Sequence, residues 1–460
     1  MDHAVGAGTV RGFDEATWQE LSGAWGEPPW LRKRRQEAWE HFRSLPLPAP
    51  TEEAWRRTPP EKLAWDGLQP LVARGAADAG DALQAAASLL PDRLAAVVIR
   101  NGAGVRAEGV EALTPRGVVF CDLRTAAREH PELLEPFLFR AGLRPEENVF
   151  TAQHVAFTTG GAFLHVPAGV EVDRPLLVVD WLAGEGFLAP HTLVVLERGS
   201  RATLVQLRSG RASGPALVNA GVELVVAEGA QLRFVQLQDL PDQARSFGVV
   251  RAQVGRDATV HTLVASFGAS LEKLFVESWL DAPGGSSEML GAFFARDGQH
   301  YDVHTLQEHR APHTTSDLLY KVALLDSARS VFAGLIRVHP GAQKTNAFQS
   351  NRNLLLSGQA RADSKPELEI MANDLRCTHG SAVSRLEEQH LFYLQTRGLT
   401  RQQAVHMIVE GFFSEVLDRL PVEGVRFWLE ARVARTMGAP APLGRLAALR
   451  GLLEEVTARP

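Results

Sequence analysis

Cysteine is scarce in this sequence. Only Cys121 and Cys377 occur among the 460 residues, they lie far apart, and no CxxC pair is present. Two thiols cannot build a disulfide scaffold, and such sparing use of cysteine fits a reducing cytosol. We therefore expect a cytoplasmic protein whose cysteines are free.

Other signals are missing as well. No uncharged apolar run approaches the ~18 residues that a membrane span requires. Lys and Arg (48) are fewer than Asp and Glu (54), which gives a net charge of -6 and no basic footprint for nucleic acid. The opening "MDHAVGAGTVRGFDEATW" lacks the basic patch and apolar stretch of a secretory signal. The chain also lacks a GxxxxGK[ST] loop for ATP and a GxSxG nucleophile elbow.

The composition changes along the chain and predicts four regions. Residues 1–95 are rich in helix formers and contain six of the nine tryptophans, which predicts a helical region with its own aromatic packing. Residues 96–149 form a mixed transition segment. From residue 150 to 385 short β-rich runs alternate with turns, and residues 386–460 return to helical periodicity.

The turns of the β-rich region repeat. Segments such as "ERGSRATLVQL", "AEGAQLRFVQL" and "GRDATVHTLVA" align at Gly199, Gly229 and Asp257, and a fourth aligns at Gly285. The resulting steps of 30, 28 and 28 residues indicate a repeat architecture whose units contain strands and no amphipathic helix. This pattern favours a β-solenoid, because a propeller blade needs about 40 residues and four strands.

The C-terminal region has clear helix signals. Thr400 and Gln403 form a capping box at the start of "TRQQAVHMIVEGFFSEVLDRL", and Pro421 ends this helix. Two more helices are predicted, in "VEGVRFWLEARVARTM" and in residues 443–458. The first helix offers an amphipathic face to a partner protein. Its predicted partner-binding residues are Phe412, Phe413, Val416 and Leu420.

The segment "NDLRCTHGSAV" places His379 two residues after Cys377. In an extended strand both side chains lie on the same face. Thiolate and imidazole suit iron–sulfur clusters, zinc or copper, but two donors do not close a site, so a metal site needs ligands from another chain. A catalytic Cys–His dyad and a buried structural cysteine are the alternatives.

A histidine-rich segment, "HYDVHTLQEHRAPHTTSD", carries His300, His304, His309 and His313. The spacing does not match a zinc motif within a strand. On a solenoid these side chains would scatter over several faces, so we expect polar strand surface here.

The run "QSNRNLLLSGQARADSKPELEIMANDLRCTHGSAV", followed by "LFYLQTRG", resembles the SufB/SufD family of iron–sulfur cluster assembly proteins. The upstream segments "FAGLIRVHPGAQKTNAFQ" and "HRAPHTTS" are similar too, and the resemblance covers nearly the whole chain. Within the family, "LPLPAPTEEAWRRTPPEKL" and the Cys-x-His-Gly segment are most similar to the SufD branch.

The resemblance implies a mainly β fold, a right-handed parallel β-helix flanked by N-terminal and C-terminal helical domains. It implies a non-catalytic scaffold in a complex with SufB, which pairs through the β-helix, and with the ATPase SufC, which docks on the C-terminal helices. A nascent iron–sulfur cluster would form at the SufB interface. His379, with Cys377 beside it, would contribute ligands there, and the isolated chain could form a homodimer.

Two alternatives stay open. The chain could be a SufB-like homodimeric scaffold, or a β-helix enzyme that acts on polysaccharide. Such enzymes line a groove with clustered carboxylates, and the acidic residues of residues 150–385 are scattered instead.

Overall fold

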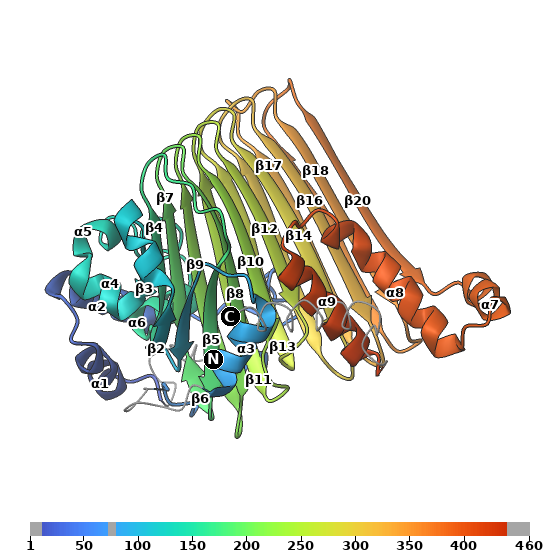
Figure 1. The fold of residues 1–460 in the computed structure, drawn as a ribbon, viewed down its shortest axis with the longest axis horizontal. Coiled ribbons are helices and arrows are strands. Elements are labelled where there is room, and N and C mark those ends of the chain that lie inside the picture. Colours follow the sequence, from blue (N-terminus) through green and yellow to red (C-terminus); the bar gives the residue numbers. More distant parts are fainter. Residues whose placement is uncertain (1–11, 72–79, 439–460) are drawn as a thin grey trace, which may run out of the picture.

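The computed structural model describes residues 12–71 and 80–438, so the helix predicted at residues 443–458 lies outside the described part of the chain. The described residues form a long solenoid of two facing sheets with helices on both outer faces (Figure 1). No helix within these two ranges is long and apolar enough to cross a membrane.

Sheet A contains, from the last coil backwards, β19 (Arg361–Ile370), β17 (Arg329–Val338), β15 (His300–His309), β13 (Leu271–Leu280), β11 (Ala244–Val254), β9 (Ala216–Val226), β7 (Pro190–Leu196), β4 (Gly160–Val166) and β3 (Val119–Asp122), with β6 (Gly186–Leu188) beside β9. Sheet B contains β2 (Ala103–Glu108), β1 (Ala95–Arg100), β5 (Leu176–Ala183), β8 (Arg201–Arg211), β10 (Gln231–Asp239), β12 (Thr259–Ser266), β14 (Ser286–Ala295), β16 (Thr315–Leu324), β18 (Asn346–Leu355) and β20 (Arg376–Arg385).

The pairing confirms the predicted fold class. From β7 and β8 onward the chain alternates between the sheets, and each strand pairs in parallel with the strand two places along the chain. This is a parallel β-solenoid, and only β2 and β3 pair in antiparallel fashion, at its first coils. The domain boundaries at residues 95, 149 and 385 stay predictions.

Stacked turns set the repeat. Four turn residues share a left-handed backbone: Gly199 (φ +66°), Gly229 (φ +66°), Asp257 (φ +52°) and Gly284 (φ +77°). Ser286 pairs with Thr259, so Gly284 occupies the position equivalent to Asp257, and the predicted alignment at Gly285 was wrong by one residue. The repeat in the sequence does not show this shift of one residue. The position of a turn is set by the residue with the left-handed backbone, and at this turn either of two adjacent glycines could adopt it.

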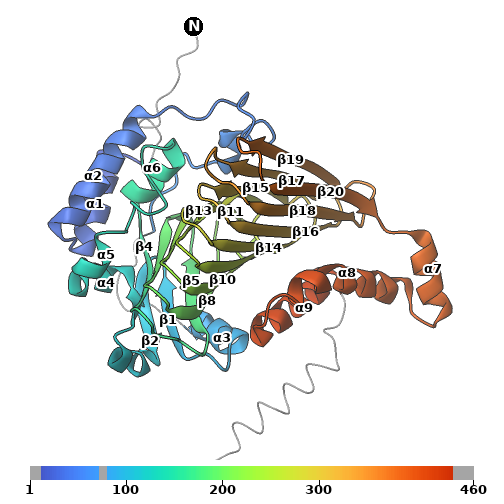
Figure 2. The same ribbon diagram turned by 90° about the horizontal axis from the view of Figure 1, so that it is seen from above.

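The solenoid interior is mostly apolar, with Val, Leu and Phe side chains from both sheets packed between them. The two outer faces are covered by separate sets of helices (Figure 2). Sheet A is covered over its first coils by α1 (Glu15–Trp25), α2 (Pro29–Ser44), α4 (Leu123–Glu129), α5 (Pro131–Leu134) and α6 (Val149–Ala156). Sheet B is covered by α3 (Gly80–Leu89), α8 (Arg401–Leu417) and α9 (Glu423–Thr436).

The remaining helical elements are short or lie outside these layers. The 3-10 turns are η2 (Pro60–Leu63), η3 (Val110–Ala112) and η4 (Thr114–Arg116). Helix α7 (Glu388–Thr396) projects beyond the last coil. As the early tryptophans predicted, the N-terminal helices share an aromatic cluster, in which Trp39 packs against Phe42 and Phe157.

An irregular segment, residues 45–59, crosses the outer face of sheet A, and we call it the strap. Trp55 stacks on Phe247 of β11 with ring centroids 6.2 Å apart. Lys273 of β13 donates a hydrogen bond of 2.6 Å to the carbonyl of Ala54. The strap thus continues from the N-terminal helices across the middle coils.

The solenoid interior also contains ionisable groups. Arg208 and Asp180 lie 3.8 Å apart and are each 3% exposed. Glu272 on β13 is 1% exposed, and burial raises its pKa to about 7. A buried carboxyl of this kind is most stable with its proton on, since the interior disfavours the charged form.

This geometry predicts a pH dependence of stability. The folded-state pKa of Glu272 lies above its unfolded value of 4.5, so its contribution is fully present below pH 4.5 and is lost as pH rises through about 7. Glutamine mimics the neutral acid, so we expect the free energy of unfolding of Glu272→Gln to fall less between pH 5 and pH 8. At pH 8 it should exceed that of the unmodified chain by up to about 3 kcal/mol. Denaturant unfolding between pH 5 and pH 8 measures it. As a control, Glu228→Gln at an exposed turn should leave the change in the free energy of unfolding with pH as it is in the unmodified chain.

Candidate metal centre at the open end of the solenoid

The last strand of each sheet has one free edge. Within residues 12–71 and 80–438, β19 pairs only with β17, and β20 pairs only with β18 (Figure 2). The backbone N–H groups of Arg361 and Met371, at the two ends of β19, donate to Ala328 and Val338 on the β17 side. Because direction alternates along a strand, the even-numbered residues of β19 turn their N–H and C=O groups to the free edge. The solenoid therefore ends in an unpaired backbone edge.

Cys377 and His379 lie on β20 at this open end. They pair with Ala347 and Gln349, which are buried in the solenoid interior, so both side chains are on the inner face, as the i, i+2 spacing predicted. Cys377 is partly buried and packs against a small apolar cluster that includes Val338. His379 is exposed because no further coil covers it.

The thiol of Cys377 keeps its proton more tightly than a free cysteine. Burial raises its pKa, and the backbone N–H of Ala347 only partly offsets this. A thiol with a raised pKa is a poor nucleophile, which argues against a catalytic dyad with His379. A metal would instead have to displace the proton on binding.

The donor set is incomplete within this chain. No group of three or more His, Cys, Asp or Glu side chains that could hold a metal occurs in residues 12–71 and 80–438. Structural zinc and iron–sulfur clusters take four protein ligands as a rule. Two donors on a free edge can therefore form only part of such a site, and further protein ligands would have to come from outside residues 12–71 and 80–438.

The interior becomes polar near this end. Gln349, Asn351 and Asn353 of β18 replace the apolar Leu318, Tyr320 and Val322 of the preceding coil. They join Ser364 and Ser381 in what we call the terminal polar cluster. Its hydrogen bonds run from Ser381 Oγ to Ser364 Oγ (2.8 Å), from Ser364 Oγ to Asn351 Oδ1 (2.8 Å) and from Asn353 Nδ2 to Asn351 Oδ1 (2.6 Å). Gln349 donates instead to the carbonyl of Gly334 (3.2 Å), and its Oε1 is buried without a partner among the described residues. The inner wall behind Cys377 and His379 is thus polar and partly bonded within itself.

Large apolar side chains surround the open end. Leu368 is 36% exposed and Ile370 is 43% exposed, although both occupy inward-facing positions that are buried in earlier coils. Met371 and Val383 are about half exposed as well. A neighbouring coil or strand would bury these side chains, which marks the end as an interaction surface.

Helix α8 begins at Thr400 with the predicted capping box. Its predicted partner-binding side chains face sheet B: Phe413, Val416 and Leu420 are 2%, 0% and 6% exposed. Phe412 is partly buried, and its carbonyl accepts a hydrogen bond from Lys321 of β16. A partner could reach these side chains only if α8 left the sheet.

The exposed aromatic surface of the C-terminal region lies elsewhere. Phe392 and Tyr393 on α7 are 68% and 57% exposed, and Met407 on α8 is 49% exposed. Sequence reasoning did not single out these residues. The signal was present in "LFYL", where Leu391 is buried and the two aromatic residues after it are not.

The four histidines of the histidine-rich segment scatter, as expected. His300 bonds Thr58 of the strap, His304 bonds Asp302 on the same outer face, and His309 points into the interior at Thr314. His300 and His309 are less exposed than expected, at 8% and 0%, and burial lowers the pKa of each to about 4, whereas His313 is exposed. They do not form one site.

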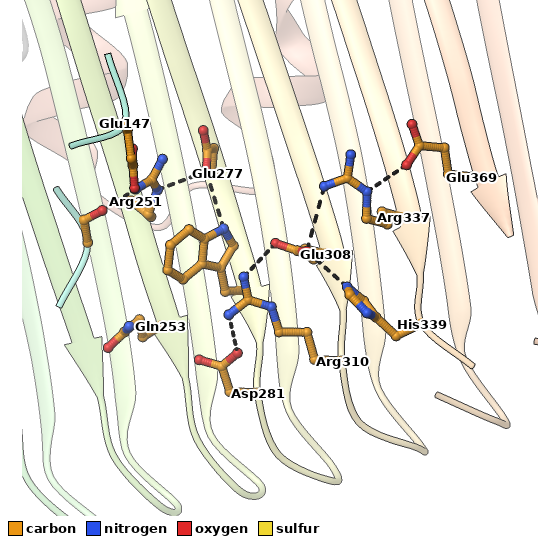
Figure 3. A network of polar contacts seen from close by, with 12 residues as sticks. Glu147, Arg251, Gln253, Glu277, Asp281, Glu308, Arg310, Arg337, His339 and Glu369 are labelled. Atoms are coloured by element: carbon orange, nitrogen blue, oxygen red, sulfur yellow. Dashed lines mark hydrogen bonds and ion pairs between the residues drawn. The ribbon is translucent and has the colours of Figure 1, made fainter. Parts of the chain in front are cut away.

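Carboxylates line the outer face of sheet A, but cationic side chains hold them (Figure 3). Arg251 bridges Glu147 and Glu277, and Glu308 contacts Arg310, all at 2.8 Å. Arg337 continues the row and binds Glu369 on the edge strand at 2.6 Å. A glycoside hydrolase needs a free pair of carboxyl groups, which this ladder does not supply.

The fold and the open end define a class: a β-solenoid whose last strands leave a free edge that carries a cysteine and a histidine. Comparison with known proteins agrees. The sequence model of the SUF system FeS cluster assembly SufBD core domain matches residues 181–412, and that of the SufBD protein N-terminal region matches residues 24–178. The chain belongs to the SufBD family of SUF-system iron–sulfur cluster assembly proteins.

Individual relatives point the same way. The iron–sulfur cluster assembly protein SufD of Bacillus subtilis is 28% identical over 93% of this chain and 99% of its own length. SufB of the same organism is 25% identical over 90% of each chain. A SufBD family protein of Mycobacterium bovis is 32% identical over 65% of this chain and 76% of its own length.

Proposed function

We propose that this chain is a SufD-like scaffold subunit that supplies part of a shared site for a nascent iron–sulfur cluster. The observation that carries the proposal is the pair His379 and Cys377, two donors on an unpaired edge strand. A partner completes the set, and SufB is the partner that we propose. Iron or the cluster is the cargo of the site, and the chain holds neither permanently.

The two donors have different roles in this proposal. The imidazole of His379 is exposed and therefore accessible to a metal, and imidazole is a common metal ligand. Cys377 is partly buried and has a raised pKa, so it is the weaker ligand and joins only when metal binding releases its proton. The terminal polar cluster lies beside them and suits a charged cargo better than an apolar wall would.

Strand β19 supports pairing with a partner strand. Its outward side chains alternate in charge from Arg361 through Asp363 and Lys365 to Glu367, and Glu369 adds a second negative charge. Two antiparallel copies with Ser364 opposite Ser364 would bring Arg361 to Glu367 and Asp363 to Lys365, so every opposed charge pair is attractive. We propose that the isolated chain forms this homodimer and that SufB replaces the second copy. The same complementarity favours the homodimeric scaffold as the second candidate.

The test of the function is co-expression with SufB and SufC. The complex should co-purify and, handled without oxygen, should carry iron and acid-labile sulfide. A chain that purifies alone under these conditions, without SufB, would contradict the proposal. We place the complex in the cytoplasm, where Cys121 and Cys377 would stay free.

We also propose that the C-terminal helices dock the ATPase SufC, and that this chain performs no catalysis. The contact surface would be Phe392, Tyr393 and Met407, since exposed aromatic and methionine side chains are typical interface anchors. Phe412, Phe413, Val416 and Leu420 would take part by holding α8 on sheet B.

A pair of variants tests this docking surface. Phe392→Ser with Tyr393→Ser should weaken SufC binding by about tenfold or more, while the melting temperature stays the same, because these side chains are exposed. Phe413→Ala should instead lower the free energy of unfolding by about 3 kcal/mol, because it empties a buried site. Phe348→Ser, at a 42% exposed position on β18, is the matched control and should retain SufC. Normal SufC pull-down by the double variant would remove α7 from the interface.

A further inference from the structure

A cleft of about 590 Å³ lies away from the open end, where the turns after β8, β10, β12 and β14 meet the last turn of α9. Its volume falls in the range of small-molecule sites. The lining is mainly polar, with Phe267 and Leu240 as its apolar part. Neither Cys377 nor His379 contributes to it.

Four arginines from separate parts of the chain converge on this cleft. Arg211 ends β8, Arg296 follows β14, and Arg432 and Arg435 lie on the final turn of α9. The lining includes only two carboxylates, Asp239 and Asp242. Cations outnumber anions on its walls, which favours an anionic occupant.

The ion pairs leave part of this charge available. Arg432 binds Asp239, and Arg296 lies 3.8 Å from Asp242 and 3.3 Å from Asp297, which is outside the lining. Arg211 turns to Asp81 outside the lining, at 3.1 Å. Arg435 is exposed and has no ion pair within the described ranges 12–71 and 80–438. At least one guanidinium therefore faces the cleft without a carboxylate.

The arginines also repel one another. Burial lowers the pKa of Arg432 most; Asp239 works against this shift, and Arg435 and Arg296 add to it. The Nε atom of Arg432 is buried and has no hydrogen-bond acceptor among the described residues. An oxyanion in the cleft would relieve both effects, because it supplies negative charge and acceptor oxygens together.

We propose that this cleft binds a small molecule through a phosphate group. Four arginines against two aspartates leave an excess of two positive charges on the lining, which matches a doubly charged phosphate better than a singly charged carboxylate. Arginine also binds phosphate oxygens in a bidentate manner. The cleft is larger than a free phosphate ion, so the ligand carries further atoms beyond it. This site is independent of the proposed cluster site and of the strand edge.

Inorganic pyrophosphate is the probe, titrated into the full chain by calorimetry at fixed ionic strength. Arg296→Gln with Arg435→Gln should weaken binding by at least about tenfold, a loss of about 1.4 kcal/mol. These two substitutions leave the Arg432–Asp239 pair in place, so α9 should stay docked and the melting temperature should not change. Arg198→Gln with Arg256→Gln removes the same charge from exposed turns on the opposite side of the solenoid and should bind as the unmodified chain does.

Three results would overturn the proposal. The first is no saturable binding of pyrophosphate to the unmodified chain. The second is an equal loss of pyrophosphate affinity in the Arg198/Arg256 control, which would mean that the overall charge of the protein, and not the cleft, causes the loss. The third is citrate binding as tightly as pyrophosphate, which would assign the cleft to carboxylates.

Discussion

Replacing His379 with alanine should leave the complex with SufB and SufC intact and should lower its iron and acid-labile sulfide severalfold. The side chain is exposed and makes no contact that folding depends on, so the melting temperature should change little. The complex should nevertheless hold less cluster, because the remaining donors of the shared site supply one ligand too few. Anaerobic purification followed by iron and sulfide analysis measures the effect.

His390→Ala is the matched control. His390 is exposed on α7, lies 3.5 Å from Glu387 and is off the free edge, so cluster content should be normal. Cys377→Ala should have a smaller effect than His379→Ala, because a partly buried thiol is close in size to alanine and is the weaker ligand. Full cluster content together with a lowered melting temperature in the His379→Ala complex would make His379 a structural residue.

Leu368→Pro should weaken association of the chain, with itself and with SufB, by more than about tenfold while the solenoid stays folded. The N–H of Leu368 points to the free edge and faces no strand in the described part of the chain, so proline removes a donor that an added strand would use. Pro366 already occupies the same edge, which shows that proline fits there. Sedimentation of the chain alone and co-purification with SufB give the two readouts.

Leu368→Ala separates the backbone from the side chain. It keeps the N–H group and removes only a 36% exposed side chain, so association should weaken by no more than about threefold. Wild-type association of the proline variant would mean that partners bind a different surface. Equal loss in both variants would mean that apolar contact, and not strand addition, joins the chains.

Local signals allowed much of the fold to be predicted. Turn residues at near-constant steps revealed the solenoid, because each left-handed turn needs glycine or aspartate at the same place. The shared face of Cys377 and His379 followed from strand geometry alone. Thr400 and Gln403 marked the start of α8 for the same reason, since a capping box is a contact between near neighbours.

Local sequence patterns could not predict the features that depend on contacts between distant segments of the chain. The apolar side of α8 suited a partner protein and the chain's own sheet equally well, and only the fold places Phe413 against Phe294 of β14. The exposure of Ile370 is likewise invisible in the sequence, since an inward position is buried in every coil except the last. The four arginines of the cleft come from segments up to about two hundred residues apart, and no periodicity connects them.

The strap constrains the order in which the solenoid can fold. Repeat arrays can fold by adding one unit to the next, because each unit touches only its neighbours. Here Glu53, in the strap, reaches Lys365 of the last sheet A strand at 3.2 Å, and Thr58 bonds His300 at 2.8 Å. The strands that the strap packs on are synthesised some two hundred to three hundred residues after it. During translation the strap therefore cannot dock until these later strands have folded. Once bound, the strap connects the last sheet A strand to the beginning of the chain through the Glu53–Lys365 ion pair, a long-range contact that an array of units touching only their neighbours lacks.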